Sequence, residues 1–577
     1  MEMNEVLERL PKHLLDLVID QPYNEYTAQD HALWRYVMRQ NVRYLGKFAH
    51  GSYSEGLKKT GISIDEIPHM YGMNRILKEI GWAAVAVDGF IPPAAFMEFQ
   101  AYNVLVIAAD IRPIGQIEYT PAPDIIHEAA GHAPIIADAE YAEYLRLFGE
   151  IGSKAFSSAA NYRIYEAIRH LSILKTDPYT TKEEIKEAEQ QLIELDKQAV
   201  EISEMTLIRN LHWWTVEYGL IGDLDDPKIY GAGLLSSIGE SKNALSDKVK
   251  RLPYDISAKD YAFDITTMQP QLFVTPDFKH LTSVLREFEE GMALKRGGLY
   301  GIEKAIGSEN HATCVYSSGL QVSGIFTKVI ETGGKPVYIQ STGPTSLNYE
   351  NRQMEGHGVK YHKDGFGSPV GRIKGFTKPP EKISEGELRA LGIEIGSRAS
   401  IEFESGVSVK GVLENQTFKN GNLLLLSFTD CTVTYGDQVL FDPAWGTYDM
   451  AVGAEITSCY NGVADPDAYG IRFPVPAEKT RKIVHEEKQK RLFRMYREVR
   501  DIRETGKKDV DLDCIIQTLI TDYPEDWLLT LEILEYAHKH NDREMIVMAG
   551  SYLEEIKKYN PEYVHLIEQG KSLITVS

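Results

Sequence analysis

The segment IRPIGQIEYTPAPDIIHEAAGHAP, residues 111–134, contains the strongest functional pattern in the chain. Its two histidines, His127 and His132, follow a Pro-rich stretch that ends in Asp124. Asp is typical of a helix N-cap, so both histidines are expected in the first turns of a helix. On an ideal α-helix their five-residue spacing turns the side chains about 140° apart. Both can reach one metal ion only if the helix is loosened at its start or at Gly131.

A second segment, LHWWTVEYGLIG at residues 211–222, places one carboxylate in an apolar setting. Glu217 lies beside Trp213 and Trp214, and a buried carboxylate needs a cation or a metal as its partner. Two imidazoles and one carboxylate leave the opposite positions of a metal open, which suits Fe(II) enzymes that bind O₂. Structural zinc would need a fourth ligand, and none is evident. A partly exposed glutamate, or a zinc hydrolase with Glu128 as base, stays open as an alternative.

Length, charge and cysteine content narrow the class of protein. A chain of 577 residues exceeds the roughly 250–300 residues that one hydrophobic core supports, so two or three domains are expected. The 62 basic and 84 acidic residues give a net charge of −22, which disfavours nucleic acid and anionic membranes as partners. We expect neither a signal peptide nor a membrane span. The four cysteines are widely separated, which fits a reducing cytoplasm and leaves metal binding to histidine and carboxylate.

The hydrophobic pattern divides the chain into three regions. Residues 1–305 have mostly helical spacing and are predicted to form a mainly α catalytic domain. Residues 306–476 change to short alternating runs, with hairpin signals at Asn420–Gly421 and Gly436–Asp437. Residues 477–577 return to a helical pattern and are predicted to form a helical C-terminal region. The predicted fold is therefore multidomain: a mainly α domain, then a β-rich domain, then a helical tail.

Two helices are predicted in more detail. One long charged helix is expected over residues 181–220, where a polar first part gives way to an aromatic end. Another begins near residue 480 and has an apolar stripe at Leu492, Tyr496 and Val499, which is typical of a helix that faces a core. No motif in the β-rich region identifies a partner. An oligomerisation or covering role is preferred there over an interaction module, and a homo-oligomer stays open.

Three stretches, in this order, resemble the pterin-dependent aromatic amino acid hydroxylases, the family of phenylalanine, tyrosine and tryptophan hydroxylases. They are residues 111–134, HWWTVEYGL at 212–220 and YGAGLLSSIGE at 230–240. The resemblance covers about residues 20–295, roughly half of the chain. It implies the catalytic fold of this family. The implied iron ligands are His127, His132 and Glu217.

The resemblance also implies further site residues. Those implied to bind the amino acid substrate are Arg112, Thr120, Pro123, Trp213, Ser236 and Glu240. Those implied to bind the pterin are Gly89, Phe96 and Glu128, with Asp124 and Tyr230 in supporting positions. A guanidinium suits bidentate binding of a carboxylate, which is the role implied for Arg112, and Asp124 is implied to position it.

The implied reaction is hydroxylation of an aromatic ring with Fe(II), O₂ and a tetrahydropterin, and L-phenylalanine is the leading substrate, converted to L-tyrosine. Tyrosine or tryptophan hydroxylation, and 3-hydroxylation of phenylalanine, stay open because ring selectivity depends on packing. The sequence departs from the family's pattern at Pro92 and Pro93, which replace hydroxyl side chains, and at His212, where a tyrosine is usual. The reductant is therefore open too. Small molecules are the expected partners, with no nucleic acid and no membrane.

Overall fold

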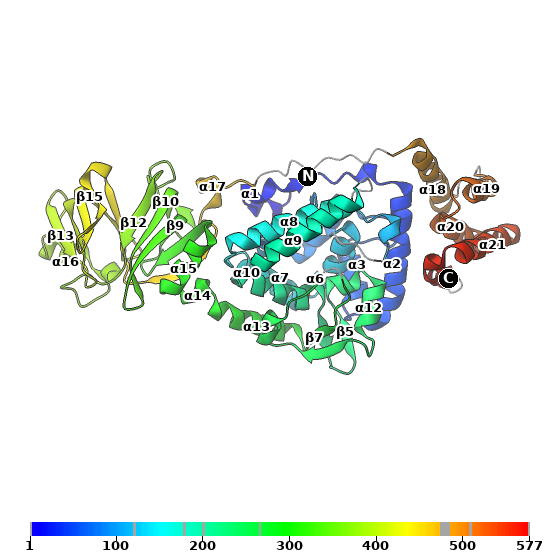
Figure 1. Ribbon diagram of the computed structural model, residues 1–577, viewed down its shortest axis with the longest axis horizontal. Helices are drawn as coiled ribbons and strands as arrows, with labels where there is room; N and C mark the ends of the chain where they lie inside the picture. Colours follow the sequence, from blue (N-terminus) through cyan, green and yellow to red (C-terminus); the bar gives the residue numbers. More distant parts are fainter. Residues whose placement is uncertain are drawn as a thin grey trace.

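The computed structural model describes residues 3–89, 91–118, 123–176, 180–198, 202–264, 267–473, 485–506 and 510–574. Figure 1 shows an elongated chain with a strand-rich part at one end, a mainly helical part in the middle and a group of C-terminal helices at the other end. The chain therefore passes through the middle part, the strand-rich part and the C-terminal helices in that order. Among the described residues, no helix is both long and apolar enough to cross a membrane.

The middle part is built against the long helix α2 (Ala28–Phe48). A capping box fixes its start, because Thr27 and Asp30 each accept a hydrogen bond from the other's backbone N–H. Most buried residues of this part belong to one large hydrophobic core, and a second, smaller cluster includes Leu14, Val85 and Phe99. Its further helices include α3 (Tyr53–Lys59), α4 (Met70–Leu77), α5 (Pro93–Ala101), α6 (Ala133–Ile136), α7 (Ala139–Gly152), α8 (Ala159–Thr176), α9 (Lys182–Gln198), α10 (Glu204–His212), α11 (Ala232–Leu235), α12 (Ile238–Ala244), α13 (Phe278–Gly291) and α14 (Ala293–Arg296).

Two small sheets, which the helical pattern does not predict, complete the middle part. Their strand orders are β1-β2-β3 and β5-β4-β7-β6. β2 and β3 are parallel and are connected through α5. Every residue of both strands is buried, so they lack the polar alternation that would distinguish them from a buried helix. The strands are β1 (Val18–Ile19), β2 (Ala83–Val87), β3 (Val104–Ala108), β4 (Leu220–Gly222), β5 (Pro227–Ile229), β6 (Lys250–Pro253) and β7 (Gln271–Thr275).

The single long helix predicted over residues 181–220 is wrong. The chain forms α9 and then, separately, α10, whose start is capped by the Ser203 hydroxyl. Glu204, in the first turn of α10, is buried and accepts hydrogen bonds from the backbone N–H groups of Phe156 and Ala293. These tertiary contacts fix a helix start that the charge pattern does not reveal.

The strand-rich part consists of two sheets with antiparallel pairing. One has the order β11-β10-β9-β8-β18, with β12 also paired to β10, and the other has the order β13-β14-β15-β16, with β17 paired to β15. Both hairpin predictions are confirmed: Asn420–Gly421, with positive φ at both residues, joins β14 to β15, and Gly436–Asp437 joins β15 to β16. The strands are β8 (His311–Tyr316), β9 (Leu320–Thr332), β10 (Lys335–Tyr349), β11 (Arg352–Gln353), β12 (Gly365–Pro369), β13 (Arg398–Glu402), β14 (Val407–Lys419), β15 (Asn422–Tyr435), β16 (Gln438–Phe441), β17 (Tyr448–Ala451) and β18 (Ile456–Asn461).

The two sheets share their hydrophobic cores, because apolar side chains of β10 and β15 contribute to both of the clusters in this part. α15 (Gly298–Ser308) packs against β8, β9 and β18. A Cβ added at Gly301 of α15 would lie 2.9 Å from the sulfur of Cys459, so a glycine allows this close approach. α15 thus packs with the strand-rich part.

The last helices return to the middle part. α18, α20 and α22 pack against α2, and all three residues of the predicted apolar stripe on α18 pack into the core of the middle part. Arg35 of α2 is buried and donates to Glu532 and Glu535 of α20, at 2.6 Å each. The helices are α18 (Glu487–Thr505), α19 (Leu512–Asp522), α20 (Trp527–His540), α21 (Arg543–Tyr559) and α22 (Val564–Ile574).

Candidate metal and substrate site

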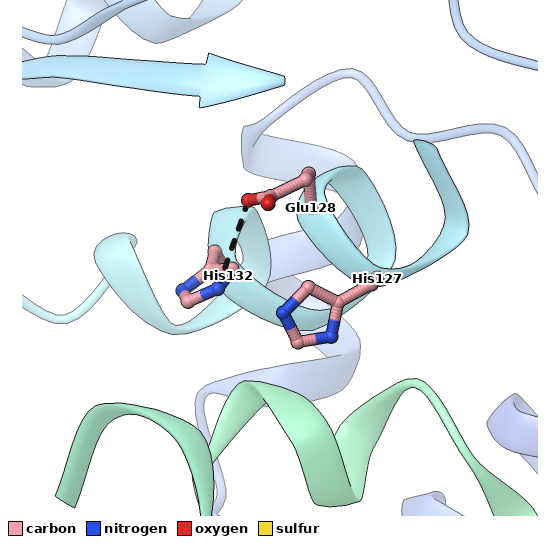
Figure 2. A group of neighbouring side chains, drawn as sticks. All are labelled: His127, Glu128 and His132. Atoms are coloured by element: carbon pink, nitrogen blue, oxygen red, sulfur yellow. Dashed lines mark ion pairs between the residues drawn. The ribbon is translucent and has the colours of Figure 1, made fainter. Parts of the chain in front are cut away.

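His127 and His132 lie on a π-helix, Ile126–His132, and not on an α-helix. Because residue i of a π-helix bonds residue i+5, side chains five apart lie on nearly the same side. The two imidazole centroids are 5.0 Å apart, and Figure 2 shows the two rings as neighbours, with the Glu128 carboxylate directed at His132. Pro134 contributes to this geometry, since a proline lacks a backbone donor and clashes with the carbonyl four residues earlier in an α-helix. The π-helix explains how a five-residue spacing suits one metal ion.

Asp124 joins the start of this helix to Arg112. Its Oδ1 accepts the backbone N–H of His127 at 3.0 Å. The carboxylate also accepts Arg112 Nε and Nη2, each at 2.8 Å. Burial alone would raise the pKa of Asp124, but the guanidinium outweighs burial and holds that pKa below its usual value. Arg112 Nη1 also donates to the Ile117 carbonyl at 3.4 Å, which leaves one further N–H on each of Nη1 and Nη2.

Glu217 ends a second π-helix, Trp213–Glu217. Its Oε2 lies 3.2 Å from His127 Nε2, and its Oε1 lies 3.4 Å from His132 Nε2. The Thr215 hydroxyl donates to the carbonyl four residues earlier, which an α-helix would bond through the backbone. Burial alone would raise the pKa of Glu217, but the two imidazoles outweigh burial and hold it well below its usual range. A charged carboxylate thus meets two imidazole nitrogens.

The donor set fits a metal ion. His132 is 2% exposed, and its Nε2 has no hydrogen-bond partner among the described residues. One cation would satisfy this nitrogen, His127 Nε2 and the Glu217 carboxylate together. Ser236 Oγ lies 3.1 Å from His127 Nδ1, where a hydrogen bond from Nδ1–H leaves Nε2 free for the metal. Nitrogen and oxygen donors without thiolate suit Fe(II) or Zn(II).

Two further titratable side chains border the cluster. Glu128 Oε2 lies 3.7 Å from His132 Nε2, and burial raises the pKa of Glu128 to about 8. His212 Nδ1 lies 3.7 Å from Glu217 Oε1, and burial lowers the pKa of His212 to about 4. Both side chains are therefore neutral near pH 7. His212 is absent from the predicted site residues, although its five-residue spacing from Glu217 repeats that of His127 and His132.

The other residues implied to bind the pterin lie at the start of α5 and in the loop before it. Phe96 on α5 meets the His212 ring edge to face, with 5.8 Å between centroids. Gly89 has a φ of +67°, a left-handed conformation that favours glycine. Pro92 and Pro93 form the N-cap and first residue of α5, where a missing backbone N–H breaks no helical bond. The prolines that depart from the family's pattern thus serve as a helix start.

Two residues implied to bind the amino acid, Trp213 and Glu240, lie in or against an aromatic group next to Glu217. The Trp213 ring stacks on Tyr218 and on Phe263, with centroid distances of 4.6 Å and 4.2 Å. The Tyr218 hydroxyl donates to Glu240 Oε1 at 3.5 Å. Burial raises the pKa of Glu240 to about 7. Sequence reasoning missed Tyr218 and Phe263, and the aromatic content of the segment around Glu217 was the available signal for Tyr218.

The remaining implied residues lie near the ends of these segments. Pro123 directly precedes Asp124 and is half-buried. Thr120 lies outside the described residues. Tyr230 is buried, and its backbone N–H donates to the Gly219 carbonyl at 3.2 Å. A Cβ at Gly219 would lie 2.3 Å from the Tyr230 hydroxyl, so this glycine allows Tyr230 to support the chain that follows the second π-helix.

The C-terminal helix α22 also reaches this site. Leu566 and Gln569 of α22 line a pocket together with Ser236, the residue that contacts His127. His565 Nε2 lies 2.7 Å from Glu118 Oε1, which joins the helix to the segment after Arg112. α22 therefore lies beside Ser236, at the edge of the candidate site.

Comparisons with known proteins show which family the middle part resembles. Residues 19–161 and 164–297 match the family model for the biopterin-dependent aromatic amino acid hydroxylases. The phenylalanine-4-hydroxylase of Chromobacterium violaceum is 28% identical over 269 residues, which cover 46% of this chain and 76% of that protein. The phenylalanine-4-hydroxylase of Pseudomonas aeruginosa is 26% identical over 270 residues, covering 46% of this chain and 86% of that protein.

Among solved structures, C. violaceum phenylalanine hydroxylase with bound iron(III) and 7,8-dihydrobiopterin has a TM-score of 0.38 and 25% identity, and the match covers 50% of this chain and 92% of that one. The family match ends where α15 begins. The resemblance predicted over about residues 20–295 is confirmed by the family match. Residues 19–297 of this chain therefore belong to the biopterin-dependent aromatic amino acid hydroxylase family.

Proposed function

We propose that this protein hydroxylates the ring of an aromatic amino acid with Fe(II), O₂ and a tetrahydropterin, and that it converts L-phenylalanine to L-tyrosine. The convergence of His127, His132 and Glu217 in a region of this family supports the proposal most strongly. The matching relatives above are phenylalanine-4-hydroxylases, which favours phenylalanine over tyrosine or tryptophan and the 4-position over the 3-position.

The proposed roles follow from the contacts. When bound, iron and tetrahydropterin would supply the oxygen activation and the two electrons that place one atom of O₂ on the substrate ring and the other on the pterin. His127, His132 and Glu217 would hold the iron. The free edge of Arg112 would bind the substrate carboxylate, and its two bonds to Asp124 keep that edge in one orientation.

Apolar and neutral groups complete the proposed site. The aromatic stack at Trp213 would exclude water from the side of the metal next to Glu217. Glu128 and Phe96 would contact the pterin. The alternative of a zinc hydrolase with Glu128 as base gains no support from the family match.

For the whole chain we propose a hydroxylase domain at residues 1–305, a β-rich domain at 306–476 and a helical region at 477–577. The end of the family match at residue 297 and the packing of α15 against the strands favour a first boundary nearer 297. The contacts of the last helices with α2 support a covering role for them. Free cysteines support the proposed cytoplasmic location.

The proposed reaction is tested with purified protein loaded anaerobically with Fe(II). Each aromatic amino acid is supplied with a tetrahydropterin, and products are identified by mass spectrometry and NMR. We expect L-tyrosine from L-phenylalanine, in amounts that depend on both iron and pterin. Product without added pterin would contradict the proposed reductant, and a 3-hydroxylated product would contradict the proposed ring position.

The metal assignment is tested with Glu217→Ala. We expect this variant to lose iron and hydroxylation together, because the remaining imidazoles provide only two ligands. The matched control is Glu143→Ala, which removes an exposed glutamate from α7 and should keep both. Full hydroxylation by a Glu217→Ala protein that binds no iron would overturn the assignment.

A further inference from the structure

A second group of metal-binding side chains lies in the strand-rich part, outside the family match. His357, His362 and Asp449 each provide one ligand atom, and these atoms lie within 4.8 Å of one another. His357 Nδ1 is 3.2 Å from His362 Nε2 and 3.9 Å from Asp449 Oδ2. His362 and Asp449 are buried, and His357 is half-buried. The group is therefore an interior cluster.

Both sheets of the strand-rich part contribute to this cluster. The histidines lie in the segment between β11 and β12, and backbone N–H groups of β10 donate to the carbonyls of both histidines at 3.0 Å. Asp449 lies on β17 of the other sheet, where the Ser427 hydroxyl of β15 donates to its Oδ1 at 2.5 Å. Backbone bonds thus hold the histidines on one sheet and the carboxylate on the other.

Hydrogen bonds alone leave this cluster unsatisfied. His357 Nδ1 offers either one proton or one lone pair, so it cannot bond His362 and Asp449 at the same time. The Asp449 side chain is 2% exposed, and its Oδ2 has no hydrogen bond of good geometry within the described ranges, although the Tyr361 hydroxyl interacts with this carboxylate. No lysine or arginine in the described part of the chain forms an ion pair with it. A buried carboxylate oxygen in this setting is stabilised when a cation meets it.

The distances fit a small divalent ion. Tetrahedral zinc with bonds of about 2.0–2.1 Å separates its ligand atoms by about 3.3 Å. The two imidazole nitrogens, at 3.2 Å, already have this separation. Asp449 Oδ2, at 3.9 Å from His357 Nδ1, would need to come about 0.6 Å nearer to that nitrogen. The Tyr361 ring stands edge-on to both histidines, with centroids 5.6 Å and 4.7 Å away. A fourth position is left for water or for the Tyr361 hydroxyl.

We propose that His357, His362 and Asp449 bind one divalent metal ion, with Zn²⁺ as the preferred ion, and that this ion joins the two sheets. Two imidazoles and one carboxylate without thiolate form a donor set that zinc accepts. The site differs in residues and in location from the His127, His132 and Glu217 centre. The proposal is also independent of the hydroxylase reaction, because it requires no turnover.

The first test uses the full chain carrying His127→Ala and His132→Ala, which removes two ligands of the first centre. Co²⁺ serves as the spectroscopic probe, and Zn²⁺ is counted by elemental analysis after dialysis. We expect one ion per chain and the visible absorption of tetrahedral Co²⁺. Adding His357→Gln or Asp449→Asn should weaken binding at least about tenfold. His311→Gln, at a half-buried histidine of β8 outside the cluster, is the control and should change nothing.

A second test leaves the first centre intact and so does not depend on folding of the double variant. The unsubstituted chain is loaded with Fe(II) and then with Zn²⁺, and both metals are counted. We expect one iron and one zinc per chain, and Asp449→Asn should keep the iron and lose the zinc, with circular dichroism confirming its strands. Absence of zinc from the unsubstituted chain, or equal zinc in Asp449→Asn, would overturn the proposal.

Discussion

Gly131→Ala tests the close packing behind the candidate iron centre. A Cβ at Gly131 would lie 2.6 Å from the Ala232 carbonyl oxygen, whereas ordinary contact begins at 3.4 Å, so the two backbones must separate by about 0.8 Å. Such overpacking costs about 1–3 kcal/mol. Alanine recovers up to about 1 kcal/mol of helix propensity relative to glycine. We therefore expect a net loss of about 1–2 kcal/mol in the free energy of unfolding.

Iron binding should respond more strongly than stability. The shift separates the first π-helix from α11, the helix that leads to Ser236, and so disturbs the contact that orients His127. We expect iron affinity, measured by competition with a chelator, to fall about 10–100-fold, and the unfolding temperature to fall by about 2–4 °C for each kcal/mol. Gly550→Ala is the matched control, because a Cβ there, within α21, meets open space. Unchanged iron affinity and unfolding temperature in Gly131→Ala would refute the reasoning.

Three further perturbations test other parts of the structure. Arg112→Lys loses the planar guanidinium that would bind the substrate carboxylate. In steady-state kinetics, KM for the amino acid should rise about 10–100-fold, with a smaller change in kcat. An unchanged KM would show that Arg112 does not bind the substrate. Burial raises the pKa of Asp526 to about 6, so the stability that this carboxyl contributes is complete below its ordinary pKa and is lost as pH rises through 6. The free energy of unfolding of Asp526→Asn, relative to that of the wild type, should therefore increase between pH 4 and 7 by up to about 3 kcal/mol, as measured by denaturant unfolding. A decrease over this pH range would contradict the predicted sign. Arg35→Met removes the most buried partner of Glu532 and Glu535, which keep ion pairs with Arg503 and Arg39 respectively. The loss of stability should therefore stay below the about 3–5 kcal/mol of a buried charge left unpaired, and hydrogen exchange in α18, α20 and α22 should increase. Unchanged protection would show that the Arg35 ion pairs do not hold these helices.

The candidate metal ligands could be proposed from the sequence because their residue types are rare in apolar or Pro-rich segments. Their geometry was not predictable, because a five-residue spacing on an α-helix points two side chains apart. The π-helices depend on local breaks in hydrogen bonding: Pro134 affects the first, and the Thr215 hydroxyl affects the second. Such breaks leave the residue types unchanged but alter which side chains converge.

Other features depend on contacts between distant segments. The strands β2 and β3 are apolar throughout and resemble a buried helix in periodicity. Glu204 interrupts a charged helix because it bonds the backbone at Phe156 and Ala293. Asp449 joins His357 and His362 only through the packing of two sheets. Local patterns cannot report these arrangements, since each needs a partner far along the chain.

The contacts between α2 and the last helices affect how the protein is synthesised. α2 ends at residue 48 and α18 begins at residue 487, so about 440 residues separate them. At about 5–20 residues per second, a ribosome needs roughly 20–90 s to deliver the covering helices. Until then the nascent chain lacks the helices that cover one face of α2 and the guanidinium of Arg35, which is buried in the finished fold. That surface is where a chaperone would act during translation, and a chain shortened before residue 487 would expose it permanently.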